Sequence, residues 1–201
     1  MSGQPTSPTL LDRLKDTADA AAWARFESVY GDLIVAFCRR RGVQATDADD
    51  VRQDVTLKLM KSLKNFTYDR ESGRFRDYLF RVTQSVLSDR TGRAREKAGP
   101  LDTAAEEQAA GAPSNHSAHE VEAVWHHEWE AFHFRRAWGV VQGTFATQHL
   151  DVFKRLLSGD PVRNVAEAFT LSEDAVHKIK QRVRDRLKEQ IAVQVAEEDG
   201  E

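Results

Sequence analysis

The segment from Asp47 to Arg95 constrains the fold more than any other part of the chain, because it reads as two amphipathic helices around a short loop. Its first part, DADDVRQDVTLKLMKSL, opens with acidic residues, and its last part, RFRDYLFRVTQSVLSDRTGRAR, ends with basic ones. The loop between them, KNFTYDRESG, is aromatic and closes on Gly73. Apolar residues recur every three or four positions in both helical parts, which is the period of a helix with one buried face. The segment therefore predicts a helical pair with one acidic and one basic surface.

Acidic residues crowd the first two turns of the predicted helix that starts near Thr46, where Thr46 and Asp49 have the spacing of a capping box. Carboxylates suit the amino end of a helix, so they could serve the helix dipole alone. Four of them with only Arg52 between exceed what capping needs. A polar, acidic face with an apolar edge suits docking of a basic helical partner. The residues that share such an exposed face are Asp50, Gln53, Asp54 and Leu57.

The helix that follows the loop is basic. Between Arg74 and Lys97, seven Lys or Arg residues oppose three acidic ones, which gives a local net charge of +4. Short polar side chains lie among them, a combination that suits phosphate contacts together with hydrogen bonds to bases. An ordinary solvated helix face is the alternative. The loop aromatics Phe66 and Tyr68 could close the core or form a platform for an unstacked base, and the sequence leaves both readings open.

Composition limits the class of protein. The chain has 201 residues, of which 40% are hydrophobic and 30% charged, as expected for one or two well-solvated helical domains. The single cysteine, Cys38, excludes an internal disulfide and a zinc site built on a cysteine pair. No apolar run is long enough to cross a membrane, and the amino-terminal residues lack the pattern of a signal peptide. We therefore expect a cytoplasmic protein without membrane insertion.

Before the acidic segment, residues 1–18 are expected to form a tail and a short helix, and a long helix is predicted from about Asp19 to Arg41. Asp19 can cap its first amides, and Gly42 is expected just beyond its last turn. Its apolar stripe comprises Trp23, Phe26, Tyr30, Ile34 and Phe37. We assign residues 19–98 to a first helical domain.

Residues 99–120 are rich in Ala, Gly, Pro and Ser and predict a flexible linker. From Leu101 to Glu130 there are seven acidic residues and no Lys or Arg. Such a linker is usually a solvated spacer, although it could also imitate nucleic acid in a basic channel. The histidines in this region lack metal-ligand spacing and a cysteine partner, so we assign neither a metal nor a cofactor; they are His116, His119, His126 and His127.

A second helical domain is predicted over residues 121–195, followed by a frayed acidic tail over 196–201. Its short helix VRNVAEAFT, the tight segment Thr170–Leu171–Ser172 and a long basic helix have the order of a helix-turn-helix. Ser172 is a good N-cap, and the following helix carries six basic residues against Asp185 between His177 and Lys188, a net charge of +5. A basic amphipathic helix without a role in DNA binding is the alternative.

Together these segments resemble the extracytoplasmic function group of bacterial sigma-70-type sigma factors. ADDVRQDV at 48–55 is similar to the acidic signature of the family, and NFTYDRESGRFRDYL matches its aromatic loop at Phe66, Gly73, Phe75 and Leu79. Tyr78 stands where tryptophan is usual, and Ser85 where asparagine is usual. LSEDAVHKIKQRVRDRL matches the second domain of the family at Leu171, Ser172, Val176, Arg182, Arg184 and Leu187. The Trp-x-x-x-Trp opening of that domain resembles a subgroup of planctomycete-like bacteria.

The resemblance implies an all-α fold with a sigma-2-like and a sigma-4-like domain and no enzymatic activity. It implies binding to core RNA polymerase, at the β′ coiled coil and the β flap, and to promoter DNA, and it allows for an anti-sigma factor. The implied polymerase contacts are Asp50, Gln53, Asp54 and Leu57. The implied contacts to the −10 element are Phe66, Tyr68, Arg74, Arg76, Tyr78, Arg81, Ser85 and Arg90. The implied contacts to the −35 element are Ser172, Glu173, His177, Lys178, Gln181, Arg182 and Arg184.

Two rival functions remain open at this point. A stand-alone helix-turn-helix regulator would bind duplex DNA tightly without polymerase, which a chain of net charge −3 should do poorly. A helical hydrolase would need a nucleophile beside a base, or a set of metal ligands, and the sequence offers neither pattern.

Overall fold

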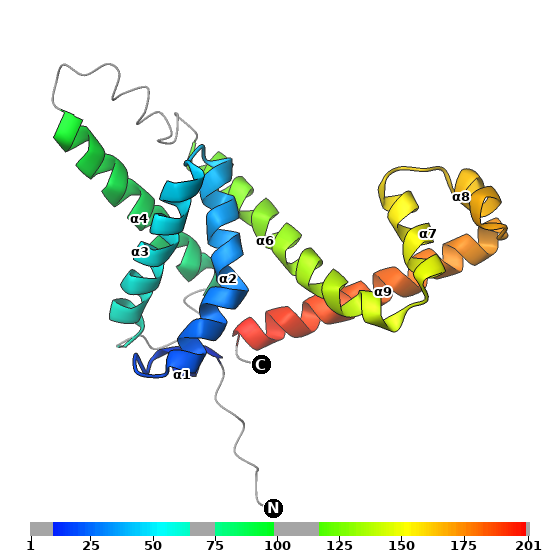
Figure 1. The fold of residues 1–201 in the computed structure, drawn as a ribbon, viewed down its shortest axis with the longest axis horizontal. Coiled ribbons are helices and arrows are strands. Elements are labelled where there is room, and N and C mark those ends of the chain that lie inside the picture. The colour runs from blue at the N-terminus through cyan, green and yellow to red at the C-terminus, as the bar shows by residue number, and fades with distance from the viewer. Residues whose placement is uncertain (1–9, 65–74, 99–116, 200–201) are drawn as a thin grey trace, which may run out of the picture. The chain divides into compact units, whose positions relative to one another are not determined.

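A computed structural model describes residues 10–64, 75–98 and 117–199, within which every regular element is a helix (Figure 1). The expected all-α fold is therefore confirmed for the described part of the chain. Two compact units are present. Unit 1 comprises residues 1–129 together with 197–201, and unit 2 comprises residues 130–196.

The described residues of unit 1 before residue 99 form the helices α1 (Leu10–Leu14), α2 (Ala20–Arg40), α3 (Ala45–Leu63) and α4 (Phe75–Ala98). The helix α3 packs against both α2 and α4, while α1 packs against α2 (Figure 1). This arrangement gives α3 two buried flanks and one outward face. The predicted acidic surface is part of that helix, so its neighbours decide which of its side chains reach solvent.

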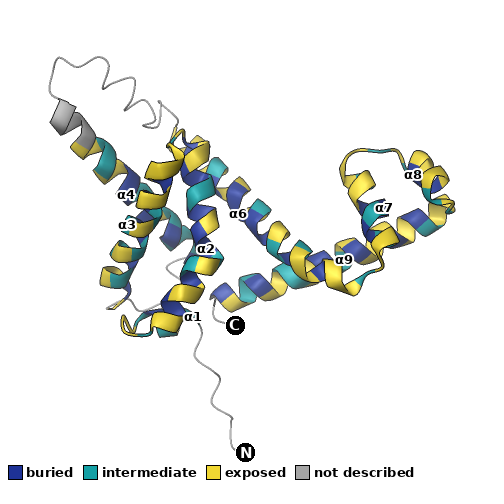
Figure 2. Ribbon diagram, viewed as in Figure 1, coloured by how far each residue is buried: buried dark blue, intermediate teal, exposed yellow. Residues whose placement is uncertain are grey.

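The apolar stripes expected from the sequence form the core of unit 1. Figure 2 shows buried positions recurring along α2 and α3 with exposed ones between them. The predicted stripe of α2 is buried throughout, at Trp23, Phe26, Tyr30, Ile34 and Phe37. The stripe of α3 is buried at Val51, Val55, Leu59 and Leu63. The three- and four-residue spacing therefore identified the inner face of α2 correctly. For α3 it identified these four residues, but Leu57 and Met60, which were also expected in the core stripe, are exposed and partly buried respectively.

The ends of α2 are also as predicted. Asp19 is its N-cap, and the Asp19 carboxylate accepts the backbone N–H of Ala22 at 3.0 Å. Arg13 pairs with the same carboxylate at 2.8 Å, and these two interactions lower the pKa of Asp19. Gly42 follows the C-cap with φ of +83°, a left-handed conformation that glycine adopts without a steric penalty.

The start of α3 differs from the prediction. The helix begins at Ala45, and its N-cap Gln44 makes no side-chain capping hydrogen bond. The expected capping box between Thr46 and Asp49 is therefore wrong, because both residues already lie inside the helix. Asp49 instead accepts a hydrogen bond from Arg52 one turn later.

Unit 1 also includes the first turns of α6 (Ala118–Val141). The Trp125 ring packs edge-on against Phe37 at 5.1 Å between ring centroids and lies 5.5 Å from Phe80. Trp129 lies over Tyr30 at 6.3 Å. The sequence analysis placed both tryptophans in the second domain, whereas the boundary between the compact units falls after Trp129. Helical periodicity showed which face of this helix is buried but not which helices bury it.

Two polar interactions support this part of α6. Glu128 is only 4% exposed, and its carboxylate pairs with the Arg40 guanidinium at 2.9 Å. At the start of the helix, Glu120 and Ser117 cap each other: the Glu120 N–H donates to the Ser117 hydroxyl, and the Ser117 N–H donates to the Glu120 carboxylate. This is a capping box of sequence S-x-x-E. The motif marks a helix start inside the segment that the sequence analysis treated as linker.

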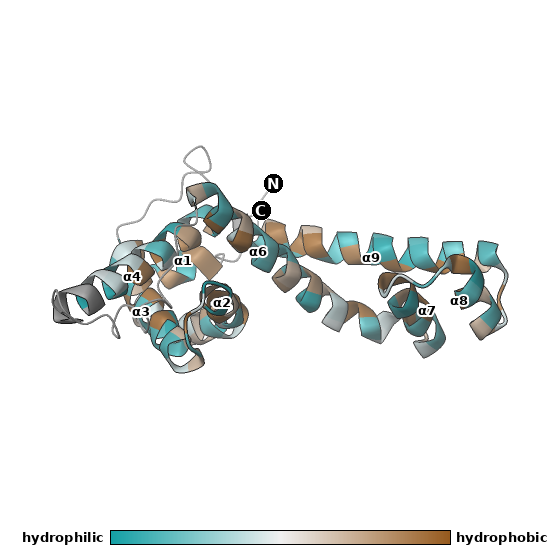
Figure 3. Ribbon diagram, turned by 90° about the horizontal axis from the view of Figure 1, so that it is seen from above, coloured by the Kyte–Doolittle hydropathy of each residue, from teal (hydrophilic) through white to brown (hydrophobic). Residues whose placement is uncertain are grey.

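Unit 2 contains the end of α6, the 3₁₀ turn η3 (Gln142–Thr144), α7 (Thr147–Leu157), α8 (Val162–Phe169) and most of α9 (Glu173–Asp199). Hydrophobic and hydrophilic positions alternate along α9 (Figure 3), and the hydrophobic ones supply much of the core of the unit. The helix continues to Asp199, through residues that the sequence analysis assigned to a frayed tail. Fully buried members of this core include Ala137, Val141, Val152, Val165, Val176 and Val183.

The connection between α8 and α9 is the predicted tight turn. Thr170 has φ of 54° and ψ of 44°, which is the left-handed conformation, and the N–H of Leu171 donates to the Ala166 carbonyl at 2.9 Å. The Ser172 hydroxyl accepts the N–H of Ala175 at 3.1 Å, so Ser172 is the N-cap of α9 as expected. Two helices separated by three residues thus form the helix-turn-helix geometry.

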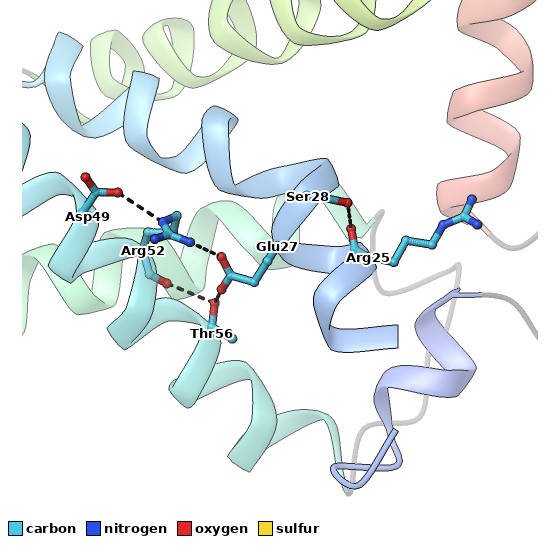
Figure 4. Close-up of polar contacts among 6 residues, drawn as sticks. All are labelled: Arg25, Glu27, Ser28, Asp49, Arg52 and Thr56. Carbon is cyan, nitrogen blue, oxygen red and sulfur yellow. Dashed lines mark hydrogen bonds and ion pairs between the residues drawn. The ribbon is translucent and has the colours of Figure 1, made fainter. Parts of the chain in front are cut away.

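The contact between α2 and α3 is polar at its edge (Figure 4). Arg52 of α3 donates to the Glu27 carboxylate of α2 and to Asp49 at 3.3 Å, and the Thr56 hydroxyl also donates to Glu27. The arginine stem lies against Gly31, where an added Cβ would come within 3.2 Å of Arg52 Cδ. Partial burial opposes the charge of the guanidinium, but its acidic partners raise the pKa of Arg52.

The interaction of Glu27 with Arg52 and Thr56, which we call the brace, predicts the effect of Glu27→Gln. The substitution removes the charge that Arg52 and Thr56 share, at a site where the two ion-pair side chains are 28% and 27% exposed. We expect the free energy of unfolding to fall by about 1 kcal/mol, measured by urea unfolding followed by tryptophan fluorescence. Asp151→Asn, which breaks an exposed ion pair within α7, is the matched control and should change stability by less than about 0.5 kcal/mol. Equal effects of the two substitutions would show that the brace contributes nothing specific.

The strained turn predicts that Thr170→Gly stabilises unit 2. A β-branched residue with positive φ is sterically disfavoured, so glycine should raise the free energy of unfolding by about 1 kcal/mol. Ser158→Gly provides the control, since Ser158 caps α7 with an ordinary φ of −74° and should lose stability. Thermal unfolding of the two variants should shift in opposite directions. A loss of stability in both would contradict the strain at Thr170.

Candidate partner and nucleic-acid interfaces

The structure places the four predicted docking residues together on the outward side of α3. Asp50, Gln53, Asp54 and Leu57 follow one another at helical spacing, opposite the buried stripe of the same helix. Leu57 is 54% exposed, which is unusual for a large aliphatic side chain. We refer to these four residues as the docking face. It combines two carboxylates, one amide and one apolar edge, a composition compatible with docking of a basic helix.

Arg90 of α4 reaches across to the docking face. Its Nη1 lies 2.7 Å from Asp54 Oδ2, and its Nη2 lies 3.2 Å from Asp50 Oδ2. Partial burial opposes the charge, but hydrogen bonds and attraction from the two carboxylates raise the pKa of Arg90. The sequence analysis expected Arg90 to contact the −10 element, and the structure shows its guanidinium on the acidic residues instead. Its role as a DNA contact stays a prediction.

A second cross-helix pair lies one turn further along α3. Lys58 Nζ donates to the Ser85 hydroxyl at 2.6 Å and to the Asp89 carboxylate at 3.0 Å. Ser85 was also expected at the −10 element, so two of those residues face α3 in this structure. The sequence analysis did not single out Lys58. A local signal was present, because Lys58 lies four residues after Asp54 on the same helix, a spacing at which acidic and basic side chains are neighbours.

The other described residues expected at the −10 element are spread along the first half of α4. The Tyr78 hydroxyl bonds with that of Ser62, and Arg76 contacts Asp77 and the His126 ring. Arg81 is exposed, and no carboxylate in the described ranges pairs with it. Phe66, Tyr68 and Arg74 lie outside the described residues, so their positions cannot be compared with the prediction.

In unit 2, the residues predicted to contact the −35 element, which we call the reading residues, lie at the start and on the solvent side of α9. Val176, Ile179 and Val183 point into the core, which leaves the intervening positions outward. The Gln181 amide donates to Asp185 at 2.8 Å and accepts from Arg184 at 2.6 Å. Such exposed intrahelical contacts are weak and are easily exchanged for contacts to a ligand. The exposed reading residues are Ser172, Glu173, His177, Lys178, Gln181, Arg182 and Arg184.

Two observations concern reactive chemistry in the described ranges. Burial raises the pKa of the Cys38 thiol to about 12, so the thiol remains protonated and unreactive near neutral pH. Within the same ranges, no three His, Cys, Asp or Glu side chains are placed to share a metal ion. No helix among the described residues is both long and apolar enough to cross a membrane.

Comparisons with known proteins identify the first unit. Residues 28–96 match the family model of sigma-70 region 2, which covers the greater part of α2, all of α3 and nearly all of α4. The chain is similar to the ECF RNA polymerase sigma factor SigE of Mycolicibacterium smegmatis, with 27% identity over 104 residues. That match covers 50% of this chain and 39% of the relative.

A solved structure, that of CnrH in complex with the cytosolic domain of CnrY, is 20% identical and covers 92% of this chain and 96% of that one. Its TM-score of 0.35 is too low to support an argument about the arrangement of the helices. The residues of α3 and nearly all of α4 lie within the region 2 match. Residues 28–96 are thus similar to sigma-70 region 2, and half of the chain is similar to an ECF sigma factor.

Proposed function

We propose that this protein is a transcription initiation factor that directs bacterial core RNA polymerase to promoters. The observation that carries the proposal is the docking face on α3, which lies within the region 2 match and combines two carboxylates with an exposed Leu57. Its partner would be a basic helix, and the family resemblance implies that this would be the β′ coiled coil of the polymerase. The protein itself would carry out no bond chemistry.

DNA recognition would be divided between the two units. The loop before α4, together with the exposed face of that helix, would take the −10 element, where extrusion of a base is offset by stacking on an aromatic side chain. In unit 2, His177, Lys178 and Gln181 would face bases of the −35 element, and Arg182 and Arg184 would hold phosphates. Their exposure on α9 and the capped helix-turn-helix geometry support this assignment. The β flap and an anti-sigma factor remain predicted partners.

The charge distribution favours a factor that needs polymerase over a stand-alone DNA binder. The whole chain has a net charge of −3, although α9 is locally basic. Affinity for duplex DNA depends mainly on the number of phosphates that basic residues neutralise, so the isolated protein should bind duplex DNA weakly. A stand-alone regulator would show the opposite behaviour.

Run-off transcription with purified bacterial core polymerase tests the proposal directly. With genomic fragments from the host as template, the wild-type protein should produce discrete new start sites. Asp50→Arg combined with Asp54→Arg should abolish polymerase binding and these starts, because it places cations opposite a basic partner. The control, Asp32→Arg with Glu122→Arg, makes the same change in net charge at exposed positions of unit 1 outside α3 and should remain active.

Circular dichroism should show that both double variants remain folded. Tight duplex binding by the protein alone, without new starts, would favour the stand-alone regulator. Unchanged polymerase affinity in the Asp50/Asp54 variant would show that the docking face lies elsewhere.

The −35 assignment predicts a difference between two residues of α9. Arg182→Ala should weaken holoenzyme binding on all promoters and reduce the slope of log affinity against log salt concentration by about 1, as expected for the loss of one phosphate contact. His177→Ala should change the preferred −35 bases and leave this slope unchanged. Lys154→Ala on α7 is the control and should alter neither property. The assignment fails if Arg182→Ala behaves like the control.

A further inference from the structure

We propose that Arg90 is a positioning residue of the docking face, and not a contact to DNA. It would fix the carboxylates of Asp50 and Asp54 in the orientation that a basic partner helix requires. The inference rests on the proposed function, because it concerns how the same surface binds polymerase. It adds a residue from α4 to a surface that is otherwise made by α3 alone.

The first support is the way Arg90 uses its two terminal nitrogens. One nitrogen binds Asp54 and the other binds Asp50, so a single planar guanidinium spans two side chains one helical turn apart. Like charges at this spacing repel each other, and each free carboxylate would sample several rotamers. A guanidinium between them offsets the repulsion and limits both side chains to one direction. Lysine, a compact point charge, does not offer this fixed fork.

The second support is that the pairing of Arg90 with Asp50 and Asp54, which we call the clamp, leaves hydrogen-bond acceptors for a partner. Each carboxylate contributes only its Oδ2 to Arg90, and no hydrogen bond from the described residues reaches Oδ1 of Asp50 or Asp54. The side chains of Asp50 and Asp54 remain 59% and 42% exposed. An ionised carboxylate can accept several hydrogen bonds, so a cation of the partner can bind without displacing Arg90. The clamp therefore orients the acids without blocking them.

The third support concerns the basic helix itself. With its guanidinium held by two carboxylates and its side chain 31% exposed, Arg90 is a poor candidate for a phosphate contact. Arg81 and Arg93 of the same helix are exposed, and no carboxylate in the described part of the chain pairs with either. The geometry thus separates the arginines of α4 into one that serves the docking face and others that remain for nucleic acid.

The test measures the affinity of the full chain for purified core polymerase. Arg90→Gln should weaken binding about fivefold, because both carboxylates lose their common partner. Arg90→Lys should weaken it nearly as much, since it keeps the charge without the fork. In a background of Asp50→Asn with Asp54→Asn, adding Arg90→Gln should cause no further loss.

Lys58→Gln is the matched control. It removes the neighbouring α3–α4 pair with Ser85 and Asp89 but touches neither acidic residue of the docking face. Its polymerase affinity should stay within about twofold of wild type. If Lys58→Gln weakened binding as much as Arg90→Gln, the effect would come from loosening the two helices, and the positioning role would be wrong. If Arg90→Gln does not fold, Arg90→Lys supplies the same comparison.

A second readout separates positioning from DNA contact. Holoenzyme is assembled with enough of the Arg90→Gln variant to saturate the core polymerase, and its promoter affinity is measured at several salt concentrations. The slope of log affinity against log salt concentration should equal that of the wild-type holoenzyme. A slope reduced by about 1 would show a lost phosphate contact and overturn the inference. Equal or tighter polymerase binding by Arg90→Gln would also overturn it, because Arg90 would then be a competitor for the acids. If the wild-type chain itself fails to bind polymerase, the proposed function is wrong, and the positioning role is lost with it.

Discussion

The seating of α3 between α2 and α4 is the constraint on which the proposed polymerase contact depends. Its stripe of Val51, Val55, Leu59 and Leu63 is almost completely buried, and burying aliphatic side chains is the main favourable term in folding. Because the stripe fixes the rotation of the helix, it also fixes which residues point outward. Asp50 and Leu57 are exposed as a result of core packing, so the docking face is a consequence of the fold.

Two arginines form ion pairs with different acidic residues of α3. Arg52 binds Glu27 of α2 and Asp49 of its own helix, and Arg90 of α4 binds Asp50 and Asp54. Each exposed ion pair contributes little free energy by itself, but each one limits the rotamers of charged side chains. Three carboxylates that would repel each other along α3, those of Asp49, Asp50 and Asp54, therefore become an ordered surface with a reduced local charge.

Much of this could be predicted from the sequence, because the relevant signals are local. The stripe of α2, the Asp19 cap, the glycine after α2 and the turn before Ser172 all follow from spacing within a few residues. The partners of Glu27, Arg90 and Trp125 could not be predicted, since each depends on a helix more than twenty residues away. Periodicity gives the buried face of a helix but not its neighbour. The Ser117–Glu120 capping box was a local signal that went unused.

The ion pairs between α3 and α4 also change how many basic residues of α4 can be counted as available for DNA contacts. A count of Lys and Arg treats all seven basic residues between Arg74 and Lys97 as available for DNA, yet Arg90 is held by acidic residues of α3. Charge density along a helix therefore overestimates the number of phosphate contacts whenever an acidic helix packs alongside. In this protein the same packing that buries the α3 stripe brings Arg90 to the acidic residues of α3 and leaves Arg81 and Arg93 exposed. Under the proposed function, one helix would thus serve two partners through different faces.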